Sequence, residues 1–301
     1  MRRTVLVWLC VGVFSYAPLA YAEMSSSNFI IRWDSLNSGG SDSSSSASFN
    51  VRDTVGESGG GNSDSTSFQI HSGYRQGVND QVITFDVFAQ TNASSRAATA
   101  SSGTTITCST AGLAVGDFIA LIQDEGASQV SAIGRIISIG GGTITVDELK
   151  DGGTAPTIDG TNDFVVKLGS SAAALSTLSS SAVSTAIVGM DVTAEVDGGY
   201  TVQIEDDGNL RDGANDINDV ADGAVTAGSE EYGGLSSDTS LAGSTFDTQD
   251  TAFTQSFQEI ATRSGASFES RDFVTLKASI SPSTPNGSYA HVLSVIVSGN
   301  Y

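Results

Sequence analysis

Phe273-Val274-Thr275-Leu276-Lys277-Ala278-Ser279-Ile280 is the stretch that decides the fold of this chain. From Val274 onward its apolar residues fall on one side and its polar residues on the other, a period of two that predicts a half-buried β-strand. A second run of this kind extends from Ser288 to Tyr301, and Pro282, Pro285 and Asn286-Gly287 favour a turn between the two runs. The end of the chain is therefore predicted to be core that closes an antiparallel β-sandwich.

The same alternation is cleanest between Ala186 and Val196, where every second residue is alanine or a larger apolar residue. Asp197-Gly198-Gly199 follows, and then a second short run from Tyr200 to Ile204. A glycine-rich turn between two alternating runs predicts a β-hairpin. Together with the closing pair of runs, this hairpin would supply four strands of the C-terminal sandwich, which we place at residues 186–301.

Short strand-like segments also fill residues 78–168. Ile83 to Ala89 alternates, and Ile137-Ser138-Ile139 and Thr143 to Val146 flank Gly140-Gly141-Gly142, a pattern that predicts a hairpin. Short strands at this spacing are typical of a small β-barrel or sandwich. The serine- and alanine-rich residues 169–185 are interpreted as a linker between this unit and the C-terminal sandwich.

The N-terminus has the features of a secretory signal peptide. Arg2 and Arg3 precede the apolar run from Thr4 to Phe14, and Ala20-Tyr21-Ala22 fits the small-x-small rule for cleavage. The apolar run is too short to cross a bilayer. We expect residues 1–22 to be removed, leaving a mature chain without a transmembrane anchor that is secreted, extracellular or held at the cell surface.

The mature chain is strongly acidic. The whole sequence has 13 basic and 34 acidic residues, and the loss of Arg2 and Arg3 leaves 13 − 2 = 11 basic residues, a net charge of -23. Such a surface repels phosphate backbones and anionic lipid, which disfavours nucleic acid as a partner. Only Cys108 remains of the two cysteines, and its alternation with Ile106 predicts a position in a core.

Residues 23–77 form a serine- and glycine-rich repeat region. An aromatic-x-aliphatic segment recurs at Phe29, Phe49 and Phe68, and each copy leads to a turn. A strand this short cannot bury its own apolar face, so stacking or docking is needed. We expect these strands to add to an edge of the following unit, in the same molecule or in a neighbour, because edge strands offer unpaired backbone groups.

Two parts of the chain resemble known bacterial proteins. The first resembles a repeat of many secreted bacterial proteins, built from aromatic-x-Leu/Val, Thr-Val-Gly and Gly-Tyr elements. It is carried by Phe49-Asn50-Val51, Thr54-Val55-Gly56, Phe68-Gln69-Ile70 and Gly73-Tyr74. The second resembles the C-terminal β-sandwich of certain bacterial surface proteins. It is carried by Gly198-Gly199-Tyr200, Glu231-Tyr232-Gly233, Pro285-Asn286-Gly287-Ser288-Tyr289 and Gly299-Asn300-Tyr301.

Those surface proteins often close with Pro-Ala-Gly-x-Tyr and Gly-Asn-Phe, so Asn286 and Tyr301 are departures from the pattern. The two resemblances imply a secreted or surface setting. Neither implies a reaction.

The densest acidic cluster lies between Glu205 and Gly223. Hard cations prefer several carboxylate and carbonyl oxygens from one flexible loop, and the glycines here would let the loop bend. The spacing is not that of an EF-hand, because Arg211 stands where a third ligand belongs. An exposed loop of Asx-turns is the alternative to a calcium site. The calcium candidates are Asp206, Asp207, Asn209, Asp212, Asp216, Asn218, Asp219 and Asp222.

Enzymatic motifs are weak in this sequence. His71 and His291 are its two histidines and fall in different units, and His291 lies on the apolar side of the last alternating run, which favours a structural role. Paired carboxylates for glycoside hydrolysis are an alternative, because a sequence does not show which acids converge. We therefore predict no catalytic residues and no bound organic cofactor.

The sequence thus predicts an all-β protein in which N-terminal short-strand repeats dock on a small β-barrel or sandwich unit, followed by a C-terminal antiparallel β-sandwich. The function that this organisation favours is a non-catalytic structural or adhesion protein of a bacterial envelope, with self-association through edge strands or contact with other envelope components. The alternative is an extracellular ligand-binding module, with calcium-assisted carbohydrate binding as one form. A carboxylate-dependent glycoside hydrolase is the third interpretation.

The signal-peptide prediction is tested by the intact mass of the exported protein. Cleavage after Ala22 gives a chain that begins at Glu23 and carries no lipid. An exported chain that retains residues 1–22, or that carries lipid on Cys10, would contradict the assignment.

Overall fold

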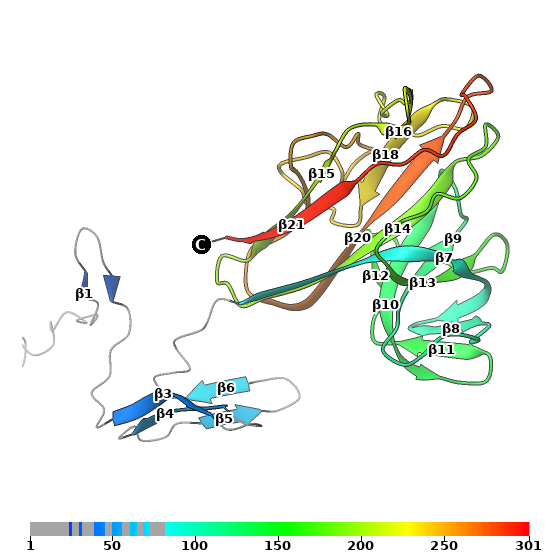
Figure 1. Ribbon diagram of the computed structural model, residues 1–301. Coiled ribbons are helices and arrows are strands. Elements are labelled where there is room, and N and C mark those ends of the chain that lie inside the picture. The colour runs from blue at the N-terminus through cyan, green and yellow to red at the C-terminus, as the bar shows by residue number, and fades with distance from the viewer. Residues whose placement is uncertain are drawn as a thin grey trace, which may run out of the picture. The chain divides into compact units, whose positions relative to one another are not determined.

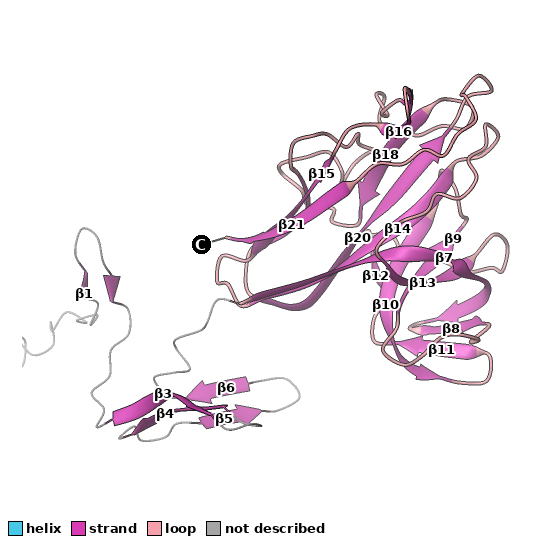
Figure 2. Ribbon diagram, viewed as in Figure 1, coloured by secondary structure: helices cyan, strands magenta, loops and turns pink. Residues whose placement is uncertain are grey.

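The computed structural model describes residues 82–300 and six short strands before residue 81. The predicted all-β fold is confirmed, since the described residues form β-strands and no helix (Figures 1 and 2). The chain divides into two compact units, Met1–Asp80 and Gln81–Tyr301. The signal peptide and the aromatic positions Phe29, Phe49 and Phe68 lie outside the described residues. The described part of the chain contains no helix long and apolar enough to cross a membrane.

The first unit contains three antiparallel strand pairs, β1–β2, β3–β4 and β5–β6. The strands β2, β4 and β6 overlap the three aromatic-x-aliphatic segments of the sequence. The bounds are β1 (Met24–Ser25), β2 (Ile30–Ile31), β3 (Gly39–Ser45), β4 (Asn50–Val55), β5 (Gly61–Asp64) and β6 (Gln69–Ser72).

The second unit begins with a closed six-stranded barrel. Its strands follow the order β13-β9-β10-β11-β8-β7, and pairing of β13 with β7 closes the ring, while β12 pairs with β10 outside it. The predicted hairpin around Gly140–Gly142 is present as β10–β11. The bounds are β7 (Ile83–Ser102), β8 (Thr105–Cys108), β9 (Phe118–Gln123), β10 (Val130–Ile139), β11 (Thr143–Val146), β12 (Lys150–Asp151) and β13 (Phe164–Ser170).

Alternating apolar residues fill the barrel. Ile106, Leu121, Ile136 and Ile144 are fully or almost fully buried in one cluster. Cys108 lies in the same cluster as a free thiol, and burial raises its pKa. The predicted core position of this cysteine is therefore confirmed.

Strand β7 belongs to the barrel and to the sandwich. Its C-terminal part pairs with β13 and β8, and residues 83–89 pair with β14 (Ser184–Ala194). The sheet then continues to β20 (Ser267–Ser279) and β18 (Glu231–Ser236), which gives ten strands in all. The barrel and the sandwich therefore share one continuous sheet through the pairing of β7 with β14. Residues 169–185, where the sequence suggests a linker, connect β13 to β14.

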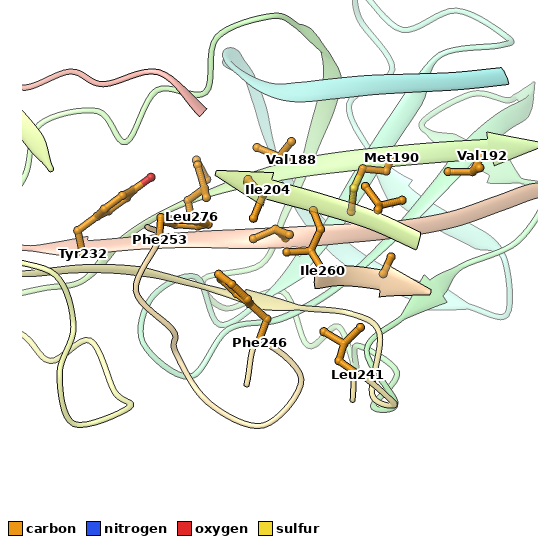
Figure 3. Close-up of a cluster of buried hydrophobic side chains, with 14 of the residues drawn as sticks. Val188, Met190, Val192, Ile204, Tyr232, Leu241, Phe246, Phe253, Ile260 and Leu276 are labelled. Carbon is orange, nitrogen blue, oxygen red and sulfur yellow. The ribbon is translucent and has the colours of Figure 1, made fainter. Parts of the chain in front are cut away.

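The second sheet of the sandwich has three strands in the order β19-β15-β21. They are β15 (Tyr200–Asp206), β19 (Gln258–Arg263) and β21 (Leu293–Gly299). A small hairpin of β16 (Leu210–Asp212) and β17 (Asn215–Ile217) follows β15. Apolar side chains from both sheets meet between them, and Figure 3 shows Met190, Ile204, Ile260 and Leu276 converging with Phe253 in this core.

The predicted hairpin between residues 186–196 and 200–204 is wrong. β14 pairs with β20 and β7, and β15 pairs with β19 and β21, so Asp197-Gly198-Gly199 carries the chain from one sheet to the other. Two alternating strands can pair edge to edge in one sheet, or they can pack face to face about 10 Å apart. Period-two alternation is the same in both cases. Here β14 and β15 belong to different sheets that pack against each other across the core.

The sandwich core gives a matched stability test. Phe253 is 1% exposed and contacts Phe246 and Tyr232, whereas Phe268 is 67% exposed. We expect Phe253→Ala to lower the free energy of unfolding by about 3–5 kcal/mol, because it removes buried apolar atoms and leaves a cavity. Phe268→Ala should change it by about 0.5 kcal/mol or less. Urea unfolding measures both, and equal effects would contradict the assignment of this core.

Candidate functional site

The acidic stretch after β15 is folded around the β16–β17 hairpin. Asp207 and Arg211 form an ion pair of 2.8 Å beside the hairpin, and the Val292 amide also donates to Asp207 at 3.0 Å. The hydrogen bonds from Arg211 and from the Val292 amide lower the pKa of Asp207 to about 2. This carboxylate therefore ties the hairpin to the segment that enters β21.

Most other calcium candidates serve the local hairpin and turn structure. Asp206 accepts from the Gly208 amide, Asp212 from the Ser288 amide and Asp222 from the Ala224 amide. The side-chain amide of Asn209 donates to Asp216 at 3.0 Å. The side-chain amide of Asn218 donates to Glu230 at 2.9 Å. The contacts of Asp206 and Asp222 join each side chain to the amide two residues on, as in Asx-turns, whereas the other three join more distant positions.

Asp219 differs from the other acids of this stretch. It is partly buried, and its Oδ1 has no hydrogen-bond partner among the described residues. Burial raises the pKa of Asp219, and the negative charges of Asp206 and Asp216 raise it further. Across the described part of the chain, no group of three or more histidine, cysteine, aspartate or glutamate side chains is placed to hold a metal ion. Calcium binding stays a prediction.

His291 is held by two hydrogen bonds next to this hairpin. Its Nδ1 lies 3.2 Å from the Gly208 carbonyl oxygen, which makes Nδ1 the donor and leaves Nε2 to accept from the Tyr232 hydroxyl at 2.9 Å. Burial lowers the pKa of His291 and raises that of Tyr232. The neutral imidazole thus joins β18 to the chain that enters β21, which is a structural task.

A polar hollow of about 610 Å³ opens where β12 meets the ends of β18 and β19. Arg263 bridges two buried carboxylates at its edge, with distances of 2.9 Å to Asp238 and 2.7 Å to Asp272. Burial raises the pKa of Asp272 against the opposing effect of Arg263, while hydrogen bonds from Thr262 and Ser240 outweigh burial and lower that of Asp238. Both carboxylates are engaged in holding β19 against the ten-stranded sheet.

A second feature is an open side of the sandwich, which we call the seam. It lies between the free edge of β21 and residues 83–88 of β7. Among the described strands, β21 pairs only with β15, and these six residues of β7 pair only with β14. The ion pairs of Arg263 and the hydrogen bond from the Ser236 hydroxyl to the Ile260 carbonyl hold β19 against β20 and β18. Because the sheet order is β19-β15-β21, β21 is the edge of this sheet opposite to β19.

The side chains that line the seam are apolar and incompletely covered. Ile83 and Phe85 from β7, and Val295 and Val297 from β21, are only partly buried against the core. Val87 continues the same side of β7 and is 39% exposed. The sandwich thus packs four strands of one sheet (β7, β14, β20 and β18) against three strands of the other, and β7 is the outermost of the four.

The backbone of β21 is also unpaired along the seam. The amide of Asp207 donates to the Val292 carbonyl and the amide of Asn300 donates to the Gly199 carbonyl, so even-numbered residues of this segment point toward β15. In an antiparallel ladder the direction alternates along the strand. The amides and carbonyls of Leu293, Val295 and Val297 therefore point outward into the seam.

The connection between β13 and β14 contributes apolar side chains to the sandwich core. Ala173, Leu175 and Leu178 from this connection pack against the sandwich core. These residues belong to the stretch that the sequence suggests as a linker, and their packing shows that it contributes to the core.

Sequence reasoning did not find the seam. The alternation of Ile83, Phe85 and Val87 marks an apolar face, and that of Leu293, Val295 and Val297 marks another. Which strand edges remain unpaired depends on pairings between residues about 100 positions apart, such as Val202 with Val297, for which a single sequence has no local signal.

Comparisons of this chain with protein-family models, with curated proteins and with solved structures give no match.

The calcium hypothesis is tested by thermal melting of the mature protein. If Asp219 and its neighbours bind calcium in the folded state, saturating calcium should raise Tm above its value in chelator, by mass action. Asp216→Asn combined with Asp219→Asn should reduce that gain. Glu195→Gln combined with Asp197→Asn removes two exposed charges elsewhere and should leave it unchanged. Equal melting temperatures in calcium and in chelator would return the hairpin to a purely structural role.

Proposed function

We propose that this chain is a secreted or cell-surface, non-catalytic structural or adhesion protein of a bacterial envelope that self-associates through edge strands. The observation that carries the proposal is the seam. It combines a row of unpaired backbone groups on β21 with half-covered apolar side chains on β7. Such an edge is a template for a strand from another chain, and folded proteins ordinarily block edges of this kind.

Three further observations support a structural role. The β-strands form a continuous sheet that joins barrel and sandwich, a stiff arrangement suited to bearing load. Charged side chains in the interior are ion-paired across elements, as in the pair of Lys277 and Asp250 at 2.8 Å. His291 is neutral and is engaged by Tyr232 and Gly208, which favours a structural histidine over a catalytic base.

A second candidate function is an extracellular ligand-binding module. The hollow beside Arg263 favours it, because its volume of about 610 Å³ lies within the usual range for small-ligand pockets. Its lining is polar, with hydroxyls of Thr239 and Ser240 and the ammonium of Lys150. A small polar molecule such as a sugar is the ligand that this lining fits, with calcium involved only if the acidic hairpin binds it.

The proposed self-association is tested by light scattering of the mature protein over a concentration series. We expect the average mass to rise with concentration. Val87→Asp places a charge in the seam at a position 39% exposed, so the fold should persist while association is lost. Val115→Asp adds the same charge at a position that is 63% exposed in the connection between β8 and β9, and this variant should behave like the unmodified protein.

Fractionation of the producing bacterium tests the setting. The mature protein should be found in the surface or culture-fluid fraction. A protein confined to the cell interior would contradict the setting. A chain that stays monomeric at every concentration, or that associates equally well with either aspartate substitution, would contradict self-association through the seam.

A further inference from the structure

The shape of the seam defines what can fill it. A strand added to the free edge of β21 would become the fourth strand of its sheet and would lie opposite β7. Its inward side chains would meet Ile83, Phe85 and Val87, so they must be apolar at alternate positions. A single extended segment meets this requirement, because it adds one strand to the edge of β21.

The sequence before residue 81 contains such a segment. Phe29-Ile30-Ile31-Arg32-Trp33 has three large apolar residues at alternate positions, namely Phe29, Ile31 and Trp33. The later segment that begins at Phe49 would place Asp53 on the inward side, which disfavours it. Five residues span roughly 17 Å as a strand, which matches the open part of β21.

Charge also favours this segment. Residues 81–301 contain 13 − 5 = 8 basic and 34 − 7 = 27 acidic residues. The segment from Phe29 to Trp33 carries Arg32 and no acid. In the added strand Arg32 would lie on the outward face, in the same sheet as Glu205 of β15. A cationic strand thus enters a strongly anionic unit, which steers the encounter.

The described strands before residue 81 pair only with one another, and β2 does so over just two residues with β1. Leaving this short pairing costs little, since an isolated two-stranded sheet is marginal in water. We propose that Phe29–Trp33 of a second copy of this chain adds to the free edge of β21 and fills the seam. Each copy then donates one strand and accepts one, which generates an open, head-to-tail chain of subunits. This inference rests on the proposed self-association and names the donor strand.

Disulfide trapping between two full-length mature chains tests the donor. One chain carries Arg32→Cys, and the other carries Ser294→Cys, Ile296→Cys or Ser298→Cys on the outward face of β21, so that the three positions sample the unknown register. Native Cys108 is buried and stays in place. We expect at least one mixture to form a mixed disulfide at ten-fold or greater yield over a mixture with exposed Val115→Cys.

A matched pair of substitutions separates packing from general effects of the N-terminal region. Ile31→Asp places a charge on the inward face of the donor strand and should abolish association, whereas Ile30→Asp places it on the outward face and should leave association largely intact. Association that responds equally to both substitutions would overturn the proposed strand.

The failures are distinguishable. If the unmodified chain associates but no β21 position traps Arg32→Cys above the Val115→Cys level, the donor is wrong and self-association stands. A further chain carries both Arg32→Cys and one of the β21 cysteines. If a disulfide forms within this chain and none forms between two chains, the segment fills the seam of its own molecule and the second-copy inference is overturned. If the unmodified chain is monomeric throughout, the proposed self-association and this inference fall together.

Discussion

The fold depends on the continuity of strand β7 through two different hydrophobic cores. Its N-terminal part supplies Ile83 and Phe85 to the sandwich, and its C-terminal part supplies Ala98 to the barrel. Strand β7 is both an edge strand of the sandwich sheet and one strand of the closed barrel. The barrel and the sandwich therefore cannot rotate against each other without breaking backbone hydrogen bonds of β7. The barrel removes its own edges by closing, as small barrels do. Strand β13 pairs with β7 only from Ala89 onward, so the edge of β7 along residues 83–88 remains unpaired.

Charged side chains reinforce the same junction. Arg271 is 2% exposed, contacts Asp147 of the barrel at 2.8 Å and lies over the ring of Phe118. Arg135 of β10 stacks on the same ring and reaches Asp191 of β14 at 3.1 Å. Burial raises the pKa of Asp191, and the two arginines oppose that rise. Guanidinium groups suit this place, because they pair with carboxylates in a plane and stack on aromatic faces at once.

The sequence was sufficient for the fold class but not for the pairing of the strands. Alternation identifies the strands around Val188, Ile204 and Leu276 correctly, since burial of one face imposes period two. It cannot tell edge-to-edge pairing from face-to-face packing, and for this reason the expected hairpin through Gly198-Gly199 is wrong. The eight calcium candidates illustrate a second limit. Sequence places them close together along the chain, whereas their oxygens are directed by local turns, and Asp207 faces Arg211 and Val292.

An open seam beside β21 predicts a particular pattern of backbone protection. Residue-resolved hydrogen exchange on the dilute mature protein measures it directly. The amides of Ser294, Ile296 and Ser298, which face β15, should be protected, and those of Leu293, Val295 and Val297 should exchange much faster, then slow when the concentration is raised and the seam is filled. Equal protection of the odd- and even-numbered amides of β21 in the dilute protein would contradict an open seam, because it would mean that this edge is already paired.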